Sequence, residues 1–170
     1  MKKNLLLFFL LFFTTTLYAE NKVLYLDINF ILNNSAAGKF LNSEINTINS
    51  KNIEEFKKIE NLIKSEDEKL SKQKNIIKED EYNAKIIELR SKYKTFQESV
   101  KKKNNDLNKI RENGANQILV VINELLTDYS SKNNISLIVD KKNIIIGKTE
   151  LDVTNIILDL LNKKIKKVDL

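Results

Sequence analysis

The middle of the chain, residues 36–133, contains few residues that interrupt helices. The whole chain of 170 residues has no Pro and only three Gly. Pro and Gly are the strongest helix breakers, and sheets with many tight turns depend on Gly. The sequence therefore predicts that residues 36–133 are helical nearly throughout, and that the short segments on either side form whatever else the protein contains.

Apolar side chains recur along this stretch at the spacing of a coiled coil. In the second half, the steps alternate between four and three residues over four heptads, with one polar interruption at Lys103. The first half carries a looser stripe, and a narrow stripe buries a thin seam rather than a globular core. The second-half seam comprises Tyr82, Ile86, Leu89, Tyr93, Phe96, Val100, Lys103, Leu107 and Ile110, and the first-half stripe comprises Leu41, Ile45, Ile48, Phe56, Ile59, Ile63, Leu70 and Ile77.

Two arrangements of this helical stretch are open. One unbroken helix over residues 36–133 would be about 147 Å long, whereas two antiparallel arms would each reach about 65 Å. The polar run 78–81 separates the two stripes, although it contains neither Gly nor Pro. We therefore expect a helical hairpin with its tip near residues 78–81, and an unbroken helix is the alternative.

Short β-favouring segments flank the helical stretch. Residues 22–30 are predicted to form a strand, and the apolar runs 135–139 and 144–146 are predicted to form a β-hairpin around residues 140–143. Residues 152–167 return to helical spacing, and Asp152 or Thr154 would cap that helix. The predicted fold class is α+β: residues 20–35 and 134–170 form a small strand-built body, and residues 36–133 form the arm.

The N-terminus has the order of segments typical of a secretory signal peptide. A basic start at residues 1–3 precedes an apolar run at residues 5–13, and the small residue Ala19 stands where cleavage would fall. The apolar run is far below the roughly 20 residues that span a bilayer. We expect residues 1–19 to be removed and the mature chain to lie outside the cytoplasm; an uncleaved anchor is the alternative.

Composition excludes several classes of site. The chain has no Cys and no His, so zinc fingers, disulfides and histidine bases are absent. Gly147-Lys148-Thr149 resembles the end of a phosphate-binding loop, but Lys142 stands where the first Gly should be. We expect no enzyme activity, no cofactor and no metal. The pI near 9.3 permits charge-driven nucleic-acid binding, but no base-reading motif is present, and a secreted chain would not meet nucleic acid.

A body made of a few short strands and one helix cannot bury much apolar area, and its sheet would have open edges. Self-association solves this problem when strands of several copies join and the arms project from the shared body. The number of copies does not follow from this reasoning. The residues predicted to form the oligomerisation body are Val23, Tyr25, Leu137, Val139, Ile144 and Ile146.

Charge is unevenly distributed along the arm. Residues 69–94 contain eight basic and four acidic side chains, whereas residues 54–68 carry a net charge of −3. If the tip lies near residue 80, the distal arm is cationic and attracts acidic chains or anionic lipid headgroups; a solvated helix face is the alternative. Phe56, Tyr82, Tyr93 and Phe96 could contact bound chains, although their heptad spacing favours the seam. The basic residues of the predicted tip are Lys69, Lys72, Lys74, Lys78, Lys85, Arg90, Lys92 and Lys94.

Both ends of the mature chain resemble the Skp/OmpH family of periplasmic chaperones. The resemblance is carried by residues 23–27, 30–32 and 38–39 at the first strand and the turn into the arm, and by residues 135–140, 144–146 and 152–154 with Ile157 and Leu161 at the other end. It implies a homotrimer with a β-barrel body and three arms around a cavity. It also implies a periplasmic holdase that encloses unfolded outer-membrane proteins without ATP, with anionic lipid or lipopolysaccharide as a further partner. A structural or tethering coiled coil of the cell envelope is the alternative.

Overall fold

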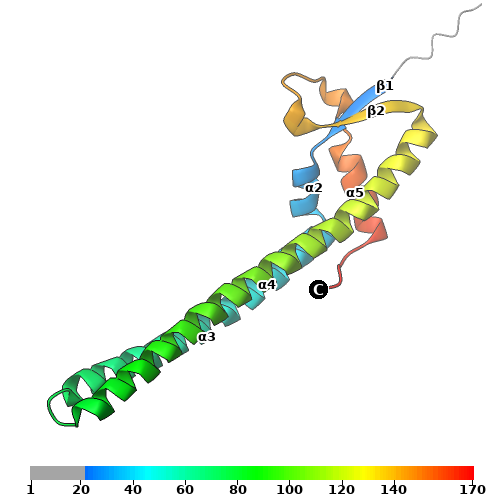
Figure 1. Ribbon diagram of the computed structural model, residues 1–170. Coiled ribbons are helices and arrows are strands. Elements are labelled where there is room, and N and C mark those ends of the chain that lie inside the picture. Colours follow the sequence, from blue (N-terminus) through cyan, green and yellow to red (C-terminus); the bar gives the residue numbers. More distant parts are fainter. Residues whose placement is uncertain (1–21) are drawn as a thin grey trace, which may run out of the picture.

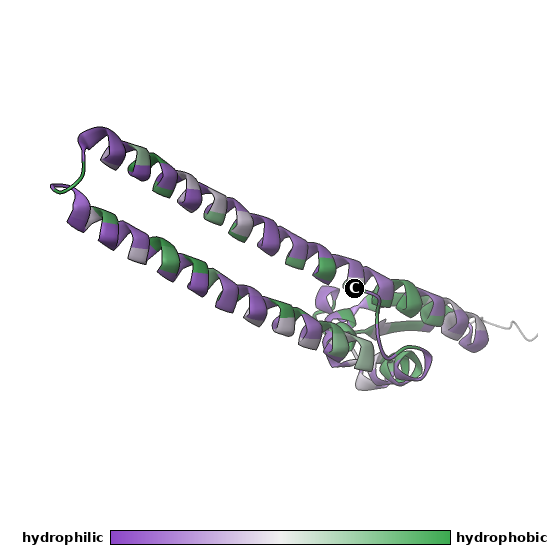
Figure 2. Cartoon of the chain, turned by 90° about the horizontal axis from the view of Figure 1, so that it is seen from below, coloured by the Kyte–Doolittle hydropathy of each residue, from purple (hydrophilic) through white to green (hydrophobic). Residues whose placement is uncertain are grey.

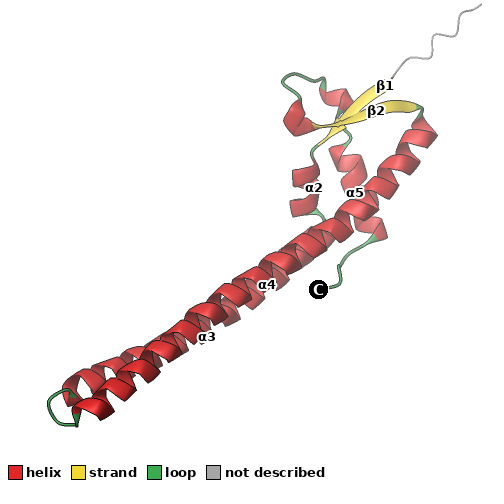
Figure 3. Ribbon diagram, viewed as in Figure 1, coloured by secondary structure: helices red, strands yellow, loops and turns green. Residues whose placement is uncertain are grey.

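A long helical hairpin projects from a small body at one end (Figure 1). The computed structural model describes residues 22–170, so the predicted signal peptide of residues 1–19 lies outside the described part. Helices and strands are distinguished in Figure 3. The elements are β1 (Lys22–Leu26), α2 (Ile28–Asn34), α3 (Ala36–Gln73), α4 (Glu79–Asn133), β2 (Ile135–Asp140), the 3-10 turns η2 (Lys141–Asn143) and η3 (Thr149–Leu151), and α5 (Thr154–Lys164).

The arm is an antiparallel hairpin of α3 and α4, so the prediction of a hairpin rather than an unbroken helix is confirmed. The chain turns at residues 74–78, slightly before the predicted tip at 78–81. Glu79, Asp80 and Glu81 form the first turn of α4, where negative side chains interact favourably with the positive end of the helix dipole. The polar run that was interpreted as the turn is therefore largely the start of the second helix.

The first strand is shorter than the predicted segment 22–30. It ends at Leu26, and residues 28–30 are already helical. Asp27 causes this change, because its carboxylate accepts a hydrogen bond of 2.8 Å from the backbone N–H of Phe30 and caps α2. The strand therefore passes directly into a helix that leads to the arm.

The predicted β-hairpin of residues 135–146 does not form. β2 pairs with β1 in parallel, with Tyr25 opposite Val139, so the helical arm is the crossover connection that parallel strands require. Residues 144–146 form no strand within the described part of the chain. After β2 the chain enters η2 and passes around Tyr25, whose hydroxyl donates to the Lys148 carbonyl at 3.1 Å.

The last helix, α5, is shorter than the predicted 152–167. Asp152 stands just outside it and accepts a hydrogen bond of 2.9 Å from the Thr154 backbone N–H. The Thr154 hydroxyl in turn accepts a hydrogen bond of 2.8 Å from the Asp27 N–H. This chain of bonds joins the end of β1 to the start of α5, so both ends of the described chain belong to one body.

The hydrophobic core lies where the body meets the root of the arm. It combines Leu24 and Leu26 of β1 with side chains from α2, α3, α4 and α5. Beyond Ile45 and Leu107 the arm has a single buried hydrophobic residue among those described, Leu70. Figure 2 shows the same division, since hydrophobic colour is denser in the body than along the arm. The distal arm therefore relies on its narrow seam alone.

Candidate functional site

The seam of the distal arm is built from the residues that the heptad pattern predicts. Phe56 of α3 and Phe96 of α4 meet edge to face, with ring centroids 6.1 Å apart. The polar interruption, Lys103, forms an ion pair with Glu55, and its ammonium lies 5.8 Å from the Phe56 ring centroid. Tyr82, Phe56 and Phe96 are partly buried as seam residues, whereas Tyr93 is half exposed.

Because the seam is narrow, both faces of the distal arm are hollowed between the two helices. One groove, of about 540 Å³, is lined by Ile63, Leu89 and Tyr93 with charged side chains at its rims. The groove on the other side, of about 450 Å³, is lined by Ile59, Leu62 and Phe96, and it shares Ile63 with the first. Apolar side chains of the seam are thus accessible from two directions.

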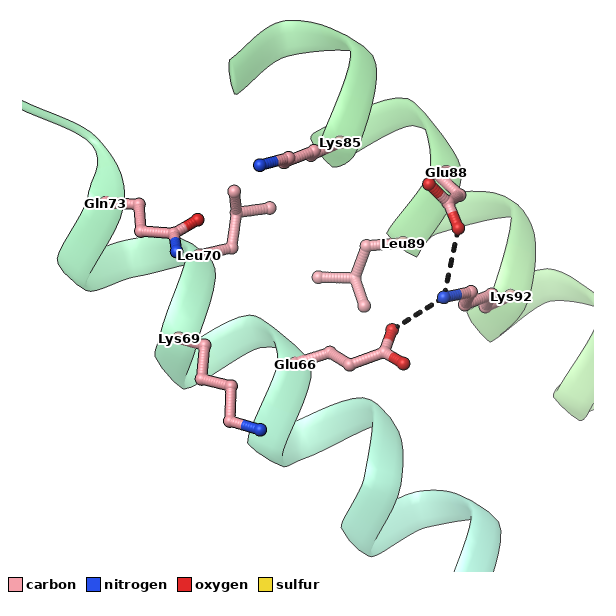
Figure 4. Close-up of a pocket in the computed structure, with 8 residues that line it drawn as sticks. All are labelled: Glu66, Lys69, Leu70, Gln73, Lys85, Glu88, Leu89 and Lys92. Carbon is pink, nitrogen blue, oxygen red and sulfur yellow. Dashed lines mark hydrogen bonds and ion pairs between the residues drawn. The ribbon is translucent and has the colours of Figure 1, made fainter. Parts of the chain in front are cut away.

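A third hollow of about 270 Å³ lies nearer the tip (Figure 4). Leu70 and Leu89 face each other from the two helices, and Lys92 reaches Glu66 across the arm at 2.9 Å and Glu88 on its own helix at 3.1 Å. Hydrogen bonds to these carboxylates raise the pKa of Lys92 above 10.5. Lys92 is therefore engaged in holding the helices together.

The basic side chains predicted for the arm tip divide into two groups. Lys85 and Lys92 are in ion pairs, with Glu81 and with Glu66 and Glu88 respectively. The remaining six are exposed and form no ion pair within residues 22–170, which leaves their charge available to an approaching molecule. These six are Lys69, Lys72, Lys74, Lys78, Arg90 and Lys94.

Several exposed apolar residues of the arm were not predicted as site residues. They lie outside the heptad seam and are between 55% and 79% exposed. For the three helical residues the signal in the sequence is an apolar residue out of register with the heptads, on a helix face that should be polar, whereas Ile76 lies in the turn at the tip. These residues are Ile53, Leu62, Ile76 and Ile87.

The six residues predicted for the oligomerisation body lie on or beside the two-stranded sheet. Tyr25 is buried, Val139 and Ile144 are partly buried, and Val23, Leu137 and Ile146 are exposed. Ile145, which was not predicted, is 99% exposed. Within the described residues, β2 pairs with no strand other than β1, so the body presents an unpaired edge together with uncovered apolar side chains.

Among the residues that the structure describes, no group of acidic side chains is placed to hold a metal ion. Among residues 22–170, no helix has the length and apolar character needed to cross a membrane.

The sequence model of the family "Outer membrane protein (OmpH-like)" matches residues 22–161, which is most of the chain. The protein belongs to this family, as the residues at its two ends suggested. A crystal structure described as that of an OmpH-like outer membrane chaperone from Caulobacter crescentus CB15 has the same fold, with a TM-score of 0.80 and 16% identity over 87% of this chain and 88% of that one. A search of curated proteins found no match.

Proposed function

We propose that the protein is an ATP-independent periplasmic holdase chaperone that encloses unfolded outer-membrane proteins between the helical arms of a homotrimer. One observation carries the proposal: the distal arm exposes apolar side chains along two shallow grooves, and the unpaired basic side chains Arg90 and Lys94 line one of them. An unfolded chain offers both apolar and acidic groups, and many weak contacts hold it while still allowing release. Family membership and the matching fold of an OmpH-like chaperone support this function.

The uncovered apolar side chains of the body support the proposed oligomer. Leu137 and Ile146 are 55% and 91% exposed beside the unpaired edge of β2. Strands from other copies would cover these residues and extend the sheet, and the arms would then surround a space. The proposed location is the periplasm, reached through the predicted signal peptide of residues 1–19 and consistent with the OmpH-like family.

The test is suppression of aggregation by the mature chain. A urea-unfolded outer-membrane protein is diluted into buffer with and without the protein, and light scattering is followed. We expect scattering to fall in the presence of the protein and to be insensitive to ATP. Scattering that equals the buffer control, together with binding to vesicles of anionic lipid, would instead support a tethering coiled coil, the function that the cationic tip also permits.

The contribution of the tip charges is tested by replacing Lys69, Lys72, Arg90 and Lys94 with Gln. We expect the variant to bind the client more weakly than the wild type at low salt. The two affinities should converge as the salt concentration rises, because the Debye length falls to about 8 Å at physiological ionic strength. The matched control removes four exposed charges nearer the root. It replaces Lys57, Lys58, Lys101 and Lys102 with Gln. Equal losses in both variants would show that net charge, and not the tip, is responsible.

A further inference from the structure

The six residues that follow α5 run back along the root of the arm, and both views place the C-terminus there (Figures 1 and 2). Val168 is 8% exposed and belongs to the hydrophobic core that α3 and α4 share with the body. The Lys167 ammonium lies 5.3 Å from the ring centroid of Phe40 on α3. The tail therefore contacts the first helix of the arm and contributes to the core between the two.

The second helix of the arm holds the tail through one side-chain amide. Gln117 of α4 donates to the Asp169 carbonyl at 2.8 Å and accepts from the Asp169 N–H at 3.0 Å. Both backbone groups of one residue are satisfied, as they would be beside a neighbouring strand. A pair of hydrogen bonds of this kind fixes both the position and the direction of the tail. A surface tail without such partners would not be held in one place.

Two further contacts anchor the base of the tail. Asn162 of α5 accepts a hydrogen bond of 2.7 Å from the Ala36 N–H at the start of α3. Lys164 forms an ion pair of 2.7 Å with Glu124 of α4. α5 and its tail thus bridge both helices of the arm at its root, beside the part of the core that the arm shares with the body.

We infer that residues 165–170, here called the strap, hold α3 and α4 at a fixed separation at the root of the arm. Opening of the hairpin is then confined to the distal half, where the seam is narrow and the two grooves lie. If the proposed function is correct, the strap limits how far each arm can splay around a client. This role is a property of the free chain and can be tested without a client.

The experiment is hydrogen exchange of the mature protein, read by mass spectrometry. Three variants weaken the strap: a chain ending at Lys164, Val168→Ala and Gln117→Ala. Gln117→Ala removes the two hydrogen bonds and leaves Val168 in place, so it remains informative if the truncated chain does not fold. The controls are Lys166→Ala in the strap and Asn116→Ala beside Gln117, both at exposed positions.

We expect exchange in residues 36–45 and 110–122 to accelerate at least about tenfold on truncation and less in the single variants, with β1 and β2 unchanged. Unchanged exchange at the root would overturn the inference. An equal acceleration of root and strands would also overturn it, because the tail would then be an ordinary part of the core. Client release, measured separately, should be faster without the strap. Absence of client binding in every variant would refute the proposed function, but it would leave the inferred role of the strap in holding α3 and α4 together unaffected.

Discussion

The joint between α2 and α3 makes a sharp prediction for Gly38→Ala. Ser35 is fully buried there, and its hydroxyl accepts a hydrogen bond of 3.0 Å from the Gly38 N–H as the cap of α3. A Cβ at position 38 would lie 1.7 Å from the Leu32 carbonyl oxygen and 3.0 Å from the Ser35 Oγ. Ordinary contacts between carbon and oxygen are about 3.3 Å or longer, so the backbone at the end of α2 would have to move by more than about 1 Å.

The magnitude follows from three opposing contributions. Ala in place of Gly within a helix raises the free energy of unfolding by about 1 kcal/mol. Overpacking of a tight contact costs about 1–3 kcal/mol, and disturbance of the Ser35 cap costs about 1 kcal/mol more. The net expectation is a loss of about 1–3 kcal/mol in the free energy of unfolding. This loss matters because the joint connects the body to the arm.

Calorimetry and urea unfolding of residues 20–170 measure the change in the free energy of unfolding. Ser50→Ala, at an exposed position of the same helix, is the control and should leave the unfolding free energy nearly unchanged or slightly higher. A Gly38→Ala chain as stable as the wild type, or more stable, would refute the reasoning. It would mean that α2 and α3 do not approach as closely as the geometry indicates.

Two further predictions concern the body and the distal arm. Burial raises the pKa of Asp152, but hydrogen bonds from Thr154 and Lys141 outweigh it and hold the pKa below 3.8. Asp152→Asn should therefore lower the free energy of unfolding by about 1 kcal/mol at pH 7. The difference from the wild type should vanish as the pH falls below 3.8 and through the pKa of Asp152 in the folded protein. A loss of stability that persists in acid would contradict this prediction. Leu70→Ala should accelerate hydrogen exchange in residues 63–89, because it removes the one buried apolar side chain there. Leu62→Ala is the control and should not accelerate exchange, because Leu62 is 65% exposed. Equal effects of the two substitutions would contradict a seam centred on Leu70.

The arm could be predicted because its signals are local. Heptad spacing identified the seam from Tyr82 to Ile110, and the structure buries these residues partly or fully except Tyr93. The interruption at Lys103 fits the same pattern, since Glu55 and the Phe56 ring lie against it. The charge count predicted the cationic tip, but the ion pairs that occupy Lys85 and Lys92 depend on side-chain positions that no spacing gives.

The body was harder to predict because its contacts join distant parts of the chain. Two apolar runs near residues 135–146 have the spacing of a β-hairpin. In the structure, however, β2 pairs with β1, and the two strands are separated in the sequence by the entire arm. Asp27 could have indicated the early end of the first strand, since it is a good cap residue three positions before Phe30. Nothing local marks Gln117 as the partner of Asp169, which lies 52 residues away.

Light scattering of residues 20–170 in solution, first without and then with an unfolded outer-membrane protein, measures both self-association and enclosure of the client. We expect a mass of three chains for the free protein, and a mass of the same three chains with one client after mixing. A single-chain mass that does not change when the client is added would contradict both the shared body and the enclosed client.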